Sequence, residues 1–71
     1  MNEKEILTKF GNNLRRIRNE KGLSMEQLAH KADIEYKQLS RIELAEINTS
    51  LLSIINLANA LEIKPNELFD Y

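Results

Sequence analysis

The stretch from Ser24 to Glu43 constrains the fold more than any other part of the sequence. Gln27 follows Ser24 at the spacing of a capping box, in which two side chains satisfy free backbone N–H groups at a helix start. Apolar residues then recur at helical spacing at Leu28, Ala29 and Ala32, and after a break at residues 33–35 the pattern resumes at Leu39 and Ile42. This pattern predicts two short helices, over about 25–32 and 36–43, joined by a tight turn.

The joints of the predicted helices carry residues suited to turns or to close packing. Gly22 stands where a left-handed residue commonly ends a helix. Asp33 lies in the turn between the two short helices, and Asp tolerates the left-handed conformation better than most other residues. We expect Ile34 to fill the space between these helices, and Gly11 to let another helix approach closely.

The remaining chain carries the same helical periodicity. A first helix is predicted over about 6–21, with an inner face formed by Leu7, Phe10, Leu14 and Ile17. A later helix is predicted over about 50–61, with Thr49 or Ser50 as its cap. We expect its core-facing stripe to contain Leu51, Ile54, Leu57, Ala58 and Leu61.

A last short helix is predicted over about 65–69, because Pro65 suits the first position of a helix. The fold class is therefore predicted to be all-α, a compact bundle of five helices. With 71 residues, the chain is expected to form a single domain over residues 1–71, with residues 1–5 as a frayed tail.

The composition argues against several classes of function. The sequence has no cysteine and only one histidine, His30, so we expect no metal site and no thiol nucleophile. The carboxylates are scattered among basic residues, so no acid/base pair is evident and we expect neither an enzyme nor a cofactor. No apolar run approaches the roughly 20 residues that span a bilayer, so a cytoplasmic protein is expected.

The charges are unevenly distributed, although the formal net charge is only −1. Residues 15–41 hold seven basic and four acidic side chains, whereas residues 42–71 hold one basic and five acidic ones. The outer face of the predicted helix 36–43 carries Tyr36, Lys37, Gln38 and Arg41. Such groups on a well-supported helix can read base edges in a major groove, although an ordinary solvated face is the plain alternative.

The order and spacing of several short motifs resemble the phage repressor/Cro family of helix-turn-helix proteins, also called the xenobiotic-response-element family. The motifs are Asn13–Arg18, Lys21–Ser24, Gln27–Ala29, Leu39–Glu43, Ser50–Leu51, Leu57–Leu61 and Glu67–Phe69. The resemblance covers roughly residues 10–69. It implies a five-helix domain that binds double-stranded operator DNA as a homodimer, with the second helix of the motif in the major groove.

The resemblance also implies roles for individual residues. By position, Tyr36, Lys37 and Arg41 would contact bases, and Gln38 lies at the edge of that surface. Ser24 and Met25 lie where the first helix of the motif approaches the phosphate backbone, although Met25 cannot donate a hydrogen bond to phosphate. Arg18 and Glu43 match a largely buried structural ion pair of the family.

Departures from the family pattern concentrate around the second helix of the motif. Glu35 replaces a common Ser or Thr cap, and residues 44–48 replace a loop that commonly carries Gly and basic phosphate-binding residues. Asn48, Thr49 and the free amides of the following helix could still hold a phosphate. Two interpretations stay open for Arg15 and its neighbour Arg16: solvated charges, or contributions to the DNA-facing field.

Three apolar residues remain unassigned around the helix 50–61. Leu52 and Ile55 widen its apolar surface beyond one face, and Ile47 in the preceding loop could join them. They either pack under the last helix or the N-terminus, or form a homodimer patch.

Together these features favour a small dimeric transcriptional regulator, of repressor or controller type, on a palindromic operator. The alternative is an antitoxin-like module of the same fold, whose main task is to hold a protein partner.

Overall fold

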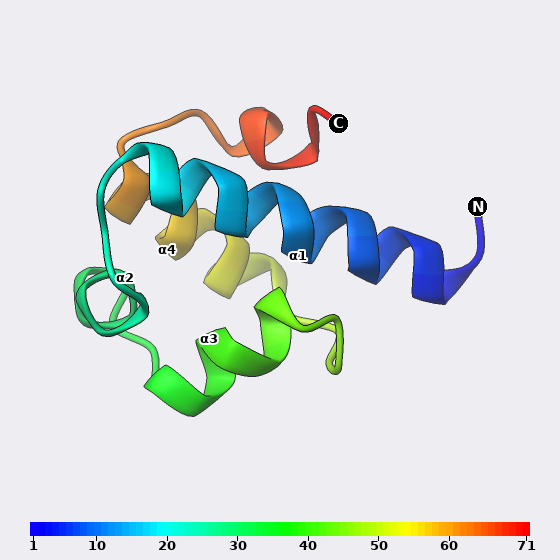
Figure 1. Cartoon of the computed structure of the whole chain (residues 1–71), viewed down its shortest axis with the longest axis horizontal. Coiled ribbons are helices and arrows are strands. Elements are labelled where there is room, and N and C mark those ends of the chain that lie inside the picture. The colour runs from blue at the N-terminus through cyan, green and yellow to red at the C-terminus, as the bar shows by residue number, and fades with distance from the viewer.

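The computed structural model describes all residues from Met1 to Tyr71. A long helix, α1 (Glu3–Glu20), runs through the middle of the molecule, and the other elements pack around it (Figure 1). They are α2 (Met25–Lys31), α3 (Tyr36–Glu43), α4 (Leu51–Leu61) and the 3-10 helix η1 (Pro65–Phe69). In Figure 1, η1 lies on one side of α1 and α3 on the other.

The expectation of five helices is corrected to four α-helices and one short 3-10 helix. The last element contains only five residues, and the N–H of Glu67 bonds to the carbonyl of Lys64 three residues back. Such a short segment ends before the wider α-helical pattern of i to i−4 bonds is established. All elements are helical, and the all-α class is confirmed.

The first helix begins at Glu3, three residues earlier than expected. The side chain of Asn2 accepts a hydrogen bond from the backbone N–H of Glu5 at 2.8 Å, which caps the helix. Glu3 and Glu5 also place negative charge at the positive end of the helix dipole. The polar N-terminus is therefore a capped helix start.

The expected turn residues are confirmed. Gly22 and Asp33 both adopt the left-handed conformation, with φ angles of 71° and 55°. Ile34 is half-buried and packs against the core. The capping box is also confirmed, since Ser24 Oγ accepts from the N–H of Gln27 at 3.1 Å and Gln27 Oε1 accepts from the N–H of Ser24 at 2.8 Å.

One apolar core joins all five elements. Its members are Phe10, Leu14, Ile17, Leu28, Ala29, Ala32, Leu39, Ile42, Leu57, Ala58, Leu61 and Leu68. The prediction that Leu51 belongs to this core is wrong, because its side chain is 75% exposed. The buried side of α4 runs through Ser53, Leu57 and Leu61, and Leu51 lies about 200° around the helix from Ser53.

Candidate nucleic-acid interface

The outer face of α3 presents the three side chains expected to contact bases. Tyr36, Lys37 and Arg41 are all exposed, whereas Leu39 and Ile42 on the opposite face are buried in the core. The exposed side chains combine an aromatic ring, an ammonium and a guanidinium. A guanidinium can donate two hydrogen bonds to guanine, and an aromatic ring can pack on a thymine methyl group.

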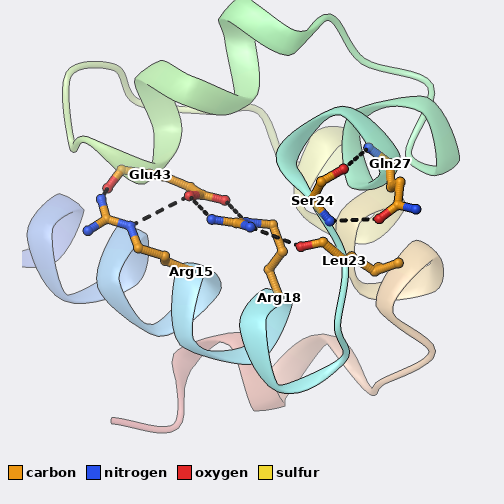
Figure 2. Close-up of polar contacts among 6 residues, drawn as sticks. All are labelled: Arg15, Arg18, Leu23, Ser24, Gln27 and Glu43. Carbon is orange, nitrogen blue, oxygen red and sulfur yellow. Dashed lines mark hydrogen bonds and ion pairs between the residues drawn. The ribbon is translucent and has the colours of Figure 1, made fainter.

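The C-terminal end of α3 is held by a buried ion pair to α1. Arg18 Nε donates to Glu43 Oε2 at 2.7 Å and Arg18 Nη2 donates to Glu43 Oε1 at 3.1 Å (Figure 2). The third nitrogen, Nη1, donates to the backbone carbonyl of Leu23 at 2.9 Å. Arg18 therefore ties together α1, the entry to α2 and the end of α3.

Arg15, whose role was left open, also bonds to the end of α3. Its Nη2 donates to the backbone carbonyl of Glu43 at 3.0 Å, and its Nε lies 3.6 Å from Glu43 Oε1 (Figure 2). A cation at a helix C-terminus also interacts favourably with the helix dipole. The side chain remains 42% exposed, so part of its charge still faces solvent.

Gly11 brings the backbones of α1 and α3 into close contact, as expected from the sequence. A Cβ atom at this position would lie 2.7 Å from the carbonyl oxygens of both Ile42 and Glu43. Any larger residue would therefore push the end of α3 away from α1.

Ser24 and Met25, the two residues expected near phosphate, make contacts within the protein. The hydroxyl and N–H of Ser24 serve the capping box described above, and the residue itself is exposed. Met25 is half-buried and packs against the core. The start of α2 therefore offers an exposed backbone turn but few free donors.

The N-terminal half of α3 is held differently from its C-terminal end. Its N-cap residue, Glu35, makes no side-chain capping bond. Gln38, half-buried, donates from Nε2 to the hydroxyl of Ser53 on α4 at 3.2 Å. That hydroxyl also accepts from Ser50 Oγ at 3.0 Å, and Ser50 caps α4 by accepting from the N–H of Ser53 at 3.1 Å.

The loop between α3 and α4 combines backbone strain with an orphaned hydroxyl. Ala45 adopts a left-handed conformation with φ of 62°, at the place where the family commonly has Gly. Asn48 is exposed, whereas the Oγ1 atom of Thr49 is buried without a hydrogen-bond partner in the protein. Both line a small groove with the apolar residues Ile6, Leu7, Phe10, Ile42, Ile47, Ile54 and Phe69.

The three residues considered for a dimer patch fall into different environments. Leu52 is 69% exposed, Ile55 is half-buried, and Ile47 packs against the core. Leu51, first assigned to the core, is exposed beside Leu52 at the start of α4. The free apolar surface is therefore centred on Leu51 and Leu52.

The role of Asn13 was not predicted from the sequence. Its Nδ2 donates to the carbonyls of Glu67 and Leu68 at 3.0 and 2.8 Å, and its Oδ1 accepts from Arg16 at 2.7 Å. Asn13 thus fastens η1 to α1. Its position between Phe10 and Leu14 on the inner face of α1 was a usable signal, because a buried amide requires partners.

Other kinds of site find little support in the structure. No group of three or more His, Cys, Asp or Glu side chains is placed to hold a metal ion. None of the helices combines the length and the apolar character that crossing a membrane requires.

Comparison with known proteins agrees with this geometry. The Helix-turn-helix family HTH_3 matches residues 14–68. The control protein C.MunI from Mycoplasma sp is 36% identical over 66 residues, which cover 92% of this chain and 89% of that protein. The control protein C.BamHI from Bacillus amyloliquefaciens is 36% identical over 63 residues, covering 87% of this chain and 78% of that protein.

A solved structure shows the same fold at higher sequence identity. The restriction-modification controller protein C.AhdI from Aeromonas hydrophila superposes with a TM-score of 0.88 at 44% identity, covering 89% of this chain and 96% of that one. The residues that the family matches, 14–68, include the ion pair, the turn and α3 described above. The chain therefore belongs to the HTH_3 helix-turn-helix family of DNA-binding transcription regulators.

Proposed function

We propose that this protein binds a specific operator as a homodimer and regulates transcription in the manner of a restriction-modification controller protein. The observation that carries the proposal is the outer face of α3, where Tyr36, Lys37 and Arg41 are exposed on a helix whose opposite face is buried. The similarity to proteins named as controllers supports the choice of controller among the functions of the family.

Arg41 is the residue assigned to sequence-specific contact. A bidentate contact from Arg to guanine contributes about 1–3 kcal/mol of discrimination against the wrong base. Lys37 and Tyr36 lie one turn or more earlier on the same helix and would contact neighbouring base pairs or phosphates. Arg15, Asn48 and the start of α2 at Ser24 are proposed as the surrounding phosphate-facing surface. Thr49 and Met25 are left out of it, because the Thr49 hydroxyl is buried and Met25 packs against the core.

The dimer is proposed to form through the apolar surface of Leu51, Leu52 and Ile55 on α4. Leu51 and Leu52 are more than two-thirds exposed, and contiguous exposed apolar side chains usually mark an interface. The protomer measures 30 × 22 × 20 Å, so two copies side by side can present recognition helices about one turn of DNA, roughly 34 Å, apart. Ile47 is left out of this interface because it packs against the core.

Selection of DNA from a random pool by the purified protein tests the proposal. We expect enrichment of a palindrome with two half-sites about one helical turn apart. Arg41→Ala should weaken binding to the selected site by roughly 10-fold or more while binding to scrambled DNA changes little. Equal affinity of the wild-type protein for selected and scrambled DNA would contradict sequence-specific recognition.

Mass measurement in solution tests the dimer. Leu52→Ser should shift the protein toward the monomer mass, whereas Leu44→Ser is the matched control at an exposed apolar residue outside α4. If neither variant changes the mass and the wild-type protein is monomeric, the apolar surface instead favours the antitoxin-like alternative, in which a protein partner covers α4.

A further inference from the structure

We infer that Gln38 is a positioning residue, which orients the first turn of α3 with Tyr36 and Lys37 by bonding to Ser53, and does not itself contact DNA. This inference rests on the proposed function, because it concerns how the same helix is held for DNA recognition. It changes the expected role of Gln38, which the sequence placed at the edge of the DNA-contacting surface.

The Gln38 amide already makes a hydrogen bond within the protein. Gln38 Nε2 donates to Ser53 Oγ at 3.2 Å, and Ser53 is 9% exposed. A Gln that recognises adenine uses both its amide oxygen and its amide nitrogen. Turning the Gln38 amide toward DNA would therefore remove a hydrogen bond from a buried hydroxyl, which is unfavourable.

The partner of Gln38 is itself held in place. Ser53 Oγ accepts a second hydrogen bond from Ser50 Oγ at 3.0 Å, and Ser50 is the N-cap of α4. The chain of hydrogen bonds from Gln38 through Ser53 to Ser50 thus runs from the middle of α3 to the first turn of α4. It is the side-chain hydrogen-bond link between these two helices.

This link is the side-chain hydrogen bond that holds the N-terminal half of α3, where Leu39 also packs in the core. The N-cap residue Glu35 makes no side-chain capping bond, and the first turn carries Tyr36 and Lys37, both exposed. The ion pair and the close backbone contact described above all act at the other end of the helix, at Ile42 and Glu43. Loss of the Gln38–Ser53 bond should therefore loosen the first turn and leave the last turn in place.

A double-mutant cycle on DNA binding tests the inference. Gln38→Ala and Ser53→Ala should each weaken binding to the selected operator by roughly three- to tenfold, the range that one hydrogen bond of typical net strength corresponds to. The double variant should bind the operator no more weakly than the more impaired single variant, because both changes remove the same Gln38–Ser53 hydrogen bond. Ala60→Gly is the control, since it weakens α4 through helix propensity without touching this link.

The effects of the two single variants on operator binding and on melting temperature distinguish the possible roles of Gln38. If Gln38 contacts DNA directly, Gln38→Ala will weaken binding and Ser53→Ala will not, and the inference is overturned. If the link has only a structural role, both variants will melt at lower temperature like Ala60→Gly while the folded proteins bind the operator as the wild type does, which also overturns it.

A measurement without DNA separates this inference from the proposed function. Backbone order parameters from ¹⁵N relaxation of the free protein should fall for residues 36–40 in Ser53→Ala and stay unchanged for residues 41–43. Unchanged order parameters throughout α3 would refute the positioning role of Gln38 even if the protein binds the operator. Failure of the wild-type protein to select any operator would instead refute the proposed function, and the positioning role with it, whatever the order parameters show.

Discussion

The two ends of α3 are held to the rest of the molecule in opposite ways. At the C-terminal end, Glu43 is buried and bonded to two arginines, and Gly11 lets α1 touch the backbone. At the N-terminal end, Glu35 provides no cap, and Gln38 supplies a hydrogen bond to α4. Of the three residues assigned to base contact, Tyr36 and Lys37 lie at this more weakly held end, whereas Arg41 lies in the last turn.

We therefore expect the stability of the fold and the geometry of the proposed DNA contact to depend on separate residues. The C-terminal end of α3 joins three helices, so changes there should affect folding of the whole domain. The N-terminal end faces solvent on one side, so changes there should affect DNA binding more than stability. The following predictions test this division, from the largest expected effect to the smallest.

Glu43→Ala should destabilise the protein most. Removing the carboxylate leaves the buried Arg18 without its partner, which costs about 3–5 kcal/mol. Urea denaturation measures the loss, and the variant should be unfolded or nearly so because a domain of this size has modest stability.

Two further variants serve as controls for the effect of Glu43→Ala. Glu20→Ala removes one partner of the exposed Arg16–Glu20 pair, at 2.8 Å, and should change stability by no more than about 0.5 kcal/mol. The double variant Arg18→Met/Glu43→Leu removes both buried charges and should recover much of the lost stability. If Glu43→Ala unfolds at the same urea concentration as Glu20→Ala, the C-terminal end of α3 is not held as described.

Gly11→Ala should have the next largest effect on stability. The added Cβ would meet two carbonyl oxygens at 2.7 Å, and such overpacking costs about 1–3 kcal/mol despite the better helix propensity of Ala. Gly22→Ala is the contrasting control, because its Cβ meets nothing within 4 Å and only its φ of 71° is unfavourable. A stabilising effect of Gly11→Ala in thermal denaturation would show that the contact between α1 and α3 is looser than described.

Glu35→Ser changes the N-cap of α3 and should increase both the stability of the protein and its affinity for DNA. Ser at an N-cap is favourable by about 0.5–2 kcal/mol over a residue that makes no capping bond. The change also removes a negative charge beside Lys37, so DNA affinity at low salt should increase. Thermal melting and DNA titration measure the two effects, and Glu26→Ser on the exposed face of α2 controls for charge alone. A gain in affinity without a gain in melting temperature would argue against the missing cap.

Ala45→Gly should give the smallest effect. Ala with φ of 62° is strained by about 1 kcal/mol, but Gly also gains freedom in the unfolded chain, so the expected net stabilisation is about 0.5 kcal/mol. Ala60→Gly, within α4, should destabilise the protein by roughly 1 kcal/mol, so the same type of substitution is expected to change stability in the opposite direction. Urea denaturation of the two variants compares them, and a loss of stability in Ala45→Gly would show that the left-handed conformation there carries no strain.

The positions of the helices could be predicted from the sequence, because the signals that set them are local. The capping box at Ser24, the left-handed residues Gly22 and Asp33, and apolar residues at steps of three and four depend on neighbours within one or two turns. The bounds of α3 were predicted without error for the same reason.

Which side chains meet across helices became clear only from the packing of the folded chain. Leu51 was assigned to the core because the helical period allows it, but Ser53 occupies the buried side of α4, where Gln38 can bond to it. Likewise, the contact of Arg15 with the Glu43 carbonyl and of Asn13 with η1 join residues 28 to 55 positions apart. The periodicity of apolar residues in one helix does not indicate which helix packs against it, so these contacts could not be predicted from the sequence.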